Sequence, residues 1–290
     1  MEVLAALGEG VRHAALLHVE GLSAGKGTEP VWLDPVSHLD VTGLGPSGPS
    51  IQLEAPLFTE AAPDYFQADL PALAGAGLLD VSLTALDLFL SVLTAALSSD
   101  GDQQVDRPML DACVRCARSP GSAFGGVLLE GAAGSQRAEL RAEEVGRLEL
   151  VRDQTPKPRA VRVVGVLDAI SPERRALQLR LRDGTLFTGR AAGLDQGALH
   201  GQQGTRVAIE GMAFSRPSGR VSIVDVAYLG LAREKGDELF ERVPGPFGGP
   251  LQAPVPQVER SGVAAVFGTW PGDETDEELL AQLEEVRRER

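Results

Sequence analysis

The chain has 290 residues, a net charge of −14 and an apolar fraction of 43%. This length accommodates about two domains with substantial cores, and the negative charge argues against nonspecific nucleic-acid binding by the whole chain. The longest apolar run, Leu83 to Leu97, contains Asp87 and is too short to span a bilayer. The N-terminus lacks the basic and apolar segments of a secretory signal. We therefore expect a cytoplasmic protein with no membrane partner.

Residues 1–152 are expected to form a mixed α/β domain. Thr84, with Asp87 three residues later, predicts a capped helix within 83–99. A second helix is predicted over 106–119, with Asp106 or Arg107 at its cap. Other short apolar segments read as strands: "AALLHVEG" (14–21), "SIQLEAP" (50–56) and "FGGVLLEG" (124–131). Residues 136–151 fit either a helix or a strand.

Residues 160–232 are expected to form a small OB-like β-barrel of five strands, three before a Gly/Gln-rich connection and two after it. The clearest signal is "ALQLRLRDGTLFTGR" (176–190), where Asp183-Gly184 favours a two-residue type I′ turn. That turn pairs Arg180 with Phe187. It directs Leu186 inward, and it directs Arg180, Arg182 and Phe187 outward.

The final part of the chain is expected to be a linker followed by a tail. Residues 243–258 contain eight prolines or glycines and predict a semi-extended linker. Residues 259–290 form an acidic tail with an amphipathic helix, capped by Thr275 and Glu278. The helix is too short to be stable alone, so it is expected to dock either on this chain's own surface or on a protein partner or a second copy. The docking residues would be the apolar stripe and two aromatic anchors: Phe267, Trp270, Leu279, Leu280, Leu283 and Val286.

Nominal catalytic and metal motifs do not survive their context. "GLSAG" around Ser23 resembles a nucleophile elbow but precedes a proline-containing stretch instead of a helix. Cys113 and Cys116 form one CxxC without a second ligand pair, and helical spacing puts both on the buried stripe. We expect no catalytic residue, no metal site and no cofactor, and therefore a non-enzymatic protein.

A basic segment within the acidic chain supports an alternative function. Residues 157–233 carry 12 basic and 6 acidic side chains, whereas residues 1–156 carry 9 and 22. Outward Arg180 and Arg182, with Phe187 beside them, could bind single-stranded nucleic acid by following phosphates and stacking a base. The competing interpretation is that this basic face contacts acidic protein surface or solvent.

Two stretches carry a partial resemblance. "FGTWPGDETDEELLAQLEEVR" (267–287) resembles the acidic C-termini of some small bacterial antitoxin-like proteins, and residues 160–230 look like a barrel in uncharacterised bacterial proteins. The resemblance implies a bacterial regulatory partner protein. The expected fold class is α+β: a mixed N-terminal domain, an OB-like barrel and a C-terminal amphipathic helix. The expected function is protein interaction, with nucleic-acid binding through the barrel as the alternative.

Overall fold

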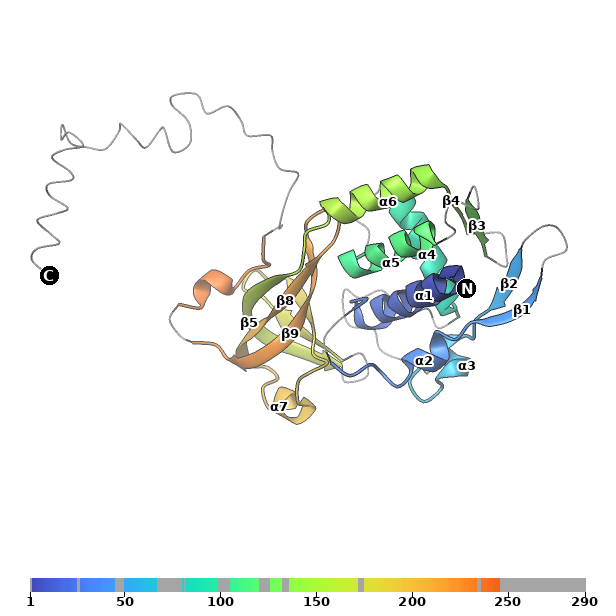
Figure 1. Cartoon of the computed structure of the whole chain (residues 1–290). Helices are drawn as coiled ribbons and strands as arrows, with labels where there is room; N and C mark the ends of the chain where they lie inside the picture. Colours follow the sequence, from blue (N-terminus) through green and yellow to red (C-terminus); the bar gives the residue numbers. More distant parts are fainter. Residues whose placement is uncertain are drawn as a thin grey trace, which may run out of the picture. The chain divides into compact units, whose positions relative to one another are not determined.

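The computed structural model describes most of the chain up to Gly245 (Figure 1). The chain divides into two compact units, Met1–Gly249 and Pro250–Arg290, and every described residue belongs to the first unit. The expected tail, 259–290, and nearly all of the expected linker lie outside the described residues. The described ranges are 2–24, 27–44, 50–66, 80, 82–98, 105–119, 126–131, 136–171, 175–233 and 236–245.

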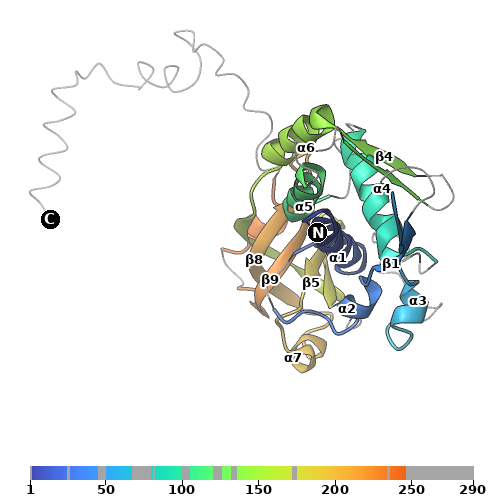
Figure 2. The same ribbon diagram turned by 45° about the vertical axis from the view of Figure 1, so that its right-hand side comes forward.

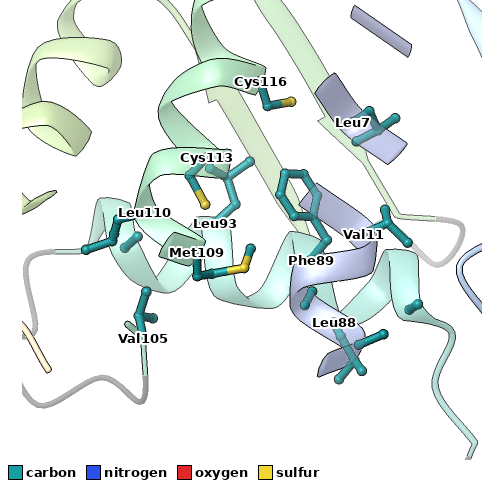
Figure 3. Close-up of a cluster of buried hydrophobic side chains, with 14 of the residues drawn as sticks. Leu7, Val11, Leu88, Phe89, Leu93, Val105, Met109, Leu110, Cys113 and Cys116 are labelled. Carbon is teal, nitrogen blue, oxygen red and sulfur yellow. The ribbon is translucent and has the colours of Figure 1, made fainter. Parts of the chain in front are cut away.

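Four longer helices surround the core of the N-terminal region. They are α1 (Glu2–Glu20), α4 (Ala85–Leu97), α5 (Arg107–Arg118) and α6 (Ala142–Gln154). Two views show these helices packed together (Figures 1 and 2), with α1 in contact with α4 and α5. Figure 3 shows side chains from three of them gathered in this core, among them Leu7 of α1, Phe89 of α4 and Cys113 of α5. Two short helices, α2 (Leu33–Val36) and α3 (Phe58–Ala61), lie between them in sequence.

The strand predicted over residues 14–21 is wrong, because this segment is the second half of α1. Those eight residues begin with four consecutive apolar positions and are too few to show a helical period. Leu7 and Val11, together with Ala14 and Val19, are buried at helical spacing. The helical period therefore becomes visible only over the full length of α1.

The two capped helices are confirmed. The Thr84 hydroxyl accepts a hydrogen bond from the Asp87 N–H at 3.1 Å, and the Asp87 carboxylate accepts one from the Thr84 N–H at 3.1 Å. Asp106 is the N-cap of α5 and accepts a hydrogen bond from the Met109 N–H at 3.0 Å. These side chains satisfy amide groups that a helix leaves without partners in its first turn.

Two small sheets accompany the helices. The first consists of β1 (Asp40–Leu44) and β2 (Ile51–Glu54), and the second of β3 (Val127–Glu130) and β4 (Arg137–Leu140). The strands predicted within 50–56 and 124–131 are thus confirmed. The ambiguous stretch 136–151 contains both β4 and the start of α6, so neither single interpretation was complete.

The barrel has its own hydrophobic core. Its strands are β5 (Arg159–Ser171), β6 (Ala176–Arg180), β7 (Leu186–Arg190), β8 (Arg206–Ser215) and β9 (Val221–Leu231). They close in the order β5-β6-β7-β9-β8, with β7 and β9 parallel and the other neighbours antiparallel. A short helix, α7 (Gln196–His200), lies between β7 and β8, and a 3₁₀ turn (Glu238–Phe240) follows β9. The mixed α+β fold with a five-stranded barrel is therefore confirmed.

The register predicted for the β6–β7 hairpin is wrong by one residue. Arg180 pairs with Leu186, and Leu179 pairs with Phe187. The connection has three loop residues instead of two, with Gly184 in the left-handed region at φ 85° and its N–H bonded to the Leu181 carbonyl at 3.0 Å. Because strand side chains alternate, this one-residue shift reverses both faces of β7.

Among the described helices, none is long and apolar enough to cross a membrane.

Candidate interaction surfaces

The structure separates the three residues proposed for nucleic-acid binding. The register shift puts Phe187 in the barrel core, 5% exposed, and leaves Leu186 40% exposed in its place. Arg180 and Arg182 are exposed on the barrel surface, but Arg180 forms an ion pair with Asp168. The expected constellation of two arginines beside a stacking aromatic ring is therefore not present.

Other barrel arginines also have acidic partners within the chain. Arg162 binds Asp237 through two hydrogen bonds of 3.0 and 3.1 Å, and it pairs with Glu210 as well. The Arg233 N–H donates a hydrogen bond to Asp237, and this bond together with the Arg162 guanidinium lowers the pKa of the Asp237 carboxyl. Arg182 lies 3.7 Å from Glu241. Much of the barrel's positive charge is thus directed to carboxylates of this chain.

The nominal nucleophile Ser23 is buried and has a structural role. Its N–H donates a 2.8 Å hydrogen bond to Asp106, and its hydroxyl donates a second one. Asp106 is 1% exposed, and burial raises the pKa of its carboxyl although the hydrogen bonds from Ser23 and Met109 oppose that rise. Ser23 therefore ties the end of α1 to the N-terminus of α5.

Cys113 and Cys116 are buried on α5, as the helical spacing predicted. Burial raises the pKa of the Cys116 thiol to about 11, and it raises the pKa of Cys113 further. Both sulfurs are protonated at neutral pH, and only a thiolate is a good nucleophile or metal ligand. Among the described residues, no group of three or more acidic, histidine or cysteine side chains is arranged to hold a metal ion.

The six partner-binding residues expected in the tail lie outside the described residues: Phe267, Trp270, Leu279, Leu280, Leu283 and Val286.

A buried ionic network joins α1 to the barrel. Glu20, at the end of α1, is 3% exposed and accepts a 2.5 Å hydrogen bond from Arg190 of β7. Arg190 also donates to Asp225 of β9 at 3.0 Å, and Arg175 lies 3.4 Å from Glu20. Beside this network, Leu22 packs against Phe214 and Ile223 of the barrel: a small apolar cluster. The outer surface of the barrel at this point is therefore occupied by α1.

The sheet of β1 and β2, here called the ribbon, has two chemically different faces. Val41 pairs with Leu53, and Leu44 pairs with Ile51. A bulge between Val41 and Gly43 adds one residue to β1, which returns Leu44 to the face that Val41 occupies. One face, here called the apolar face, is thus formed by Val41, Leu44, Ile51 and Leu53.

The described residues of the chain cover the apolar face only near its base. Leu53 packs against the N-terminal core, whereas the outer pair is open, with Leu44 82% and Ile51 51% exposed. Val41 is 58% exposed. Figure 1 shows the ribbon extending away from the helices. Among the described residues its two strands pair only with each other.

A groove lies at the base of each face. The groove on the apolar face, here called the apolar groove, has a volume of about 430 Å³ and is lined by Leu4, Gly8, Arg12, Asp34, Ser37, His38, Leu39, Val41 and Leu53. The groove on the opposite face measures about 540 Å³ and is lined by Pro35, His38, Asp40, Glu54, Ala55, Pro56, Glu60 and Ala61. Both grooves are open depressions, and they share His38.

Carboxylates dominate the second face. Asp40 and Glu54 are direct cross-strand partners, a placement that like charges disfavour. Glu60 lines the same groove, and the only basic side chain among its lining residues is His38, whose ring lies 3.2 Å from Asp40. The ribbon therefore combines an exposed apolar face with an acidic one.

Sequence reasoning did not identify the ribbon as a surface. "SIQLE" shows the alternation of an amphipathic strand, whereas in "DVTGL" the two aliphatic residues are three positions apart. The extra residue of the bulge breaks that alternation in β1, so Leu44 appears to lie opposite Val41 when the sequence is read with a strict period of two. The pairing with β2 was needed to show that they share a face.

Comparison of the chain with protein-family models, with curated proteins and with solved structures finds no match.

Proposed function

We propose that the chain is a non-enzymatic protein-interaction module and that the ribbon is a surface on which it holds a partner. The observation that carries this proposal is the exposure of three aliphatic side chains on one face: Val41 at 58%, Leu44 at 82% and Ile51 at 51%. Contiguous exposed apolar side chains of this kind mark interaction sites in soluble proteins.

The backbone of the ribbon supports the same function. A two-stranded sheet is marginally stable alone, and its outer edges present amide and carbonyl groups that another strand can pair with. The ribbon is anchored at one end, where Leu39 and Leu53 pack on the core. A partner that covers the apolar face or pairs with an edge would add the contacts that the described residues of this chain do not supply.

The C-terminal tail is a second surface in this proposal. Its apolar stripe, Leu279, Leu280, Leu283 and Val286, and its anchors Phe267 and Trp270 have the composition of a helix that binds in a groove. The resemblance of the tail to antitoxin-like C-termini implies a regulatory form of the same function, in which the partner is restrained or recruited.

Nucleic-acid binding is the less favoured function. The strand order, the parallel pair β7–β9 and the helix between β7 and β8 support an OB-like barrel, a fold that binds single strands. Single-strand binding relies on aromatic stacking and on cations that follow the phosphates. Here Phe187 is in the core, and Arg180 and Arg162 are paired with carboxylates.

Affinity purification from the source cells, followed by identification of the proteins retained by each version of the chain, tests the proposal. The full chain is compared with a ribbon variant, Leu44→Ser with Ile51→Ser, and with a chain truncated after Val258. The control is Leu150→Ser. Leu150 is 58% exposed and lies on helix α6, which is not part of the ribbon. We expect a specific protein to be retained by the wild type and the control and lost from the ribbon variant or the truncated chain. Identical partners for all four chains would contradict the proposal.

A further inference from the structure

Two glycines in α1 have different surroundings. A Cβ on Gly10 would lie 2.4 Å from the Phe89 ring, so Gly10 is needed for the close packing of α1 on α4. A Cβ on Gly8 would meet no atom within 4 Å. A glycine inside a helix costs about 1 kcal/mol relative to alanine. Nothing inside the described part of the chain accounts for that cost at Gly8.

Gly8 lies in the wall of the apolar groove. On one side of the groove are Leu4 and Gly8 of α1, and on the other are Val41 and Leu53 of the apolar face. A glycine in such a wall leaves the helix backbone open to close approach by another molecule. The missing side chain thus enlarges a depression that has aliphatic side chains on both sides and polar ones, Arg12, Asp34, Ser37 and His38, elsewhere in its lining.

The charges around the ribbon indicate the chemistry of an occupant. Asp34 is 83% exposed at the rim of the apolar groove. Asp40 and Glu54 oppose each other on the other face, and Glu60 lies beside them. The one arginine of the rim, Arg12, is already paired with Asp34 and with Glu29 at 2.7 Å. An occupant with positive charges would relieve the repulsion between these carboxylates, whereas an acidic one would increase it.

We infer that the apolar groove binds an aliphatic segment of another protein that carries lysine or arginine side chains, with Gly8 admitting its close approach to α1. The aliphatic side chains would contact Leu4, Val41 and Leu53, and the cations would reach the carboxylates at the rim and across the ribbon. This inference rests on the proposed function, and it specifies the partner's chemistry and the part of the ribbon that it occupies.

A second copy of the chain is the less suitable occupant. The N-terminal region carries 22 acidic and 9 basic side chains over residues 1–156. Two copies meeting through this face would bring their exposed carboxylates, among them Asp40 and Glu54, toward one another. Like charges brought together at an interface cost several kcal/mol.

Peptide selection on the full-length chain tests the inference. Short linear peptides displayed on phage are selected on the wild-type protein, and the enriched peptides are synthesised with a fluorescent label. We expect the enriched sequences to combine aliphatic residues with lysine or arginine. Replacing those cations with glutamate should weaken binding by at least about tenfold, a difference of about 1.4 kcal/mol.

Two glycine variants locate the binding site. Gly8→Leu fills the groove wall, whereas Gly146→Leu adds the same side chain to α6, where a Cβ also meets nothing within 4 Å. Both substitutions raise helix propensity, so neither variant should be less stable than the wild type. We expect Gly8→Leu to weaken peptide binding at least about tenfold and Gly146→Leu to leave it unchanged.

Other results would contradict the inference or separate it from the proposed function. It fails if no peptide is enriched, if the enriched peptides are acidic, or if Gly8→Leu binds them as well as Gly146→Leu does. It also fails if the wild type self-associates and Gly8→Leu alone abolishes the association, because the occupant is then a second copy. A native partner lost from Leu44→Ser with Ile51→Ser but retained by Gly8→Leu would refute this inference and leave the proposed function standing. Peptide binding at the groove without any ribbon-dependent native partner would do the reverse.

Discussion

In the β6–β7 hairpin and in the ribbon, a single residue decides which face an apolar side chain occupies. In the β6–β7 hairpin, a three-residue loop ending in Gly184 turns Phe187 into the barrel core. In the ribbon, the bulge between Val41 and Gly43 turns Leu44 onto the face of Val41, where it is 82% exposed. The same kind of irregularity therefore hides an apolar side chain in one hairpin and exposes one in the other.

The difference lies in what surrounds each hairpin. The β6–β7 hairpin has neighbours on both edges, because β6 pairs with β5 and β7 pairs with β9. The ribbon, among the described residues, has no third strand and only partial cover from α1 and the core. Barrel closure buries apolar side chains and so stabilises the fold, whereas in the described part of the chain the ribbon leaves Val41, Leu44 and Ile51 exposed.

The largest expected effect is in the barrel hairpin. Phe187→Ala should lower the free energy of unfolding by about 3–5 kcal/mol, because it leaves a cavity in the core. Leu44→Ala in the ribbon should change it by less than about 0.5 kcal/mol, because the side chain is already in water. Urea unfolding of the two variants measures both values. Similar losses for both would mean that the ribbon's apolar face is part of the fold.

A buried carboxylate, Asp106, and an exposed one, Asp40, are also expected to affect stability differently. Ser23→Ala removes a hydroxyl donor from buried Asp106 and should cost about 2 kcal/mol at neutral pH. The raised pKa means that the folded chain binds the Asp106 proton more tightly than the unfolded chain, so protonation favours folding as the pH falls toward 3.8. Since the Ser23 hydrogen bonds stabilise the charged form, the cost of Ser23→Ala should shrink over the same pH range.

Urea unfolding at several pH values measures this dependence. In an Asp106→Asn background the cost of Ser23→Ala should no longer vary with pH. On the ribbon, Asp40→Asn removes one of two opposed exposed charges and should raise stability by no more than about 0.5 kcal/mol. A cost of Ser23→Ala that grows as the pH falls would contradict the conclusion that the Ser23 hydrogen bonds favour the charged form of the Asp106 carboxyl.

A further small difference is expected between the two glycines at the irregularities. Gly184 has φ 85°, and Gly184→Ala should cost about 1 kcal/mol because a Cβ is disfavoured there. Gly43 is not in the left-handed region, and a Cβ would approach only the end of the flexible Gln52 side chain, at 3.0 Å. Gly43→Ala should therefore cost less than about 0.5 kcal/mol. Thermal unfolding of the two variants, with equal shifts as the contrary result, tests this difference.

Local chemistry predicted the parts of the fold that depend on neighbours in sequence. The caps at Thr84 and Asp106 follow from side chains within one helical turn, and the five barrel strands follow from their apolar alternation. The register of β7 could not be predicted in the same way, because an Asp-Gly pair fits both two-residue and three-residue loops. The choice between them depends on burying Phe187 against strands far along the chain.

The candidate site was less accessible to sequence reasoning than the fold. The apolar groove combines Gly8 of α1 with Val41 and Leu53 of the ribbon, and no local pattern relates these positions. Gly8 is informative only beside Gly10, whose contact with Phe89 explains one glycine and leaves the other unexplained. The basic segment was visible in the sequence, but its pairing with Asp168 and Asp237 was not.

The long strand β5 has a consequence for how the chain folds. It pairs with β6 immediately after it in sequence, and also with β8, where Arg159 lies opposite Ala213. The first pairing closes a short loop, whereas the second must wait for a distant segment, and contacts of this kind slow folding. During synthesis the helices of the N-terminal region can pack while the barrel is still open. Until β8 arrives, the edge of β5 that later pairs with β8 is open to pairing with a wrong strand.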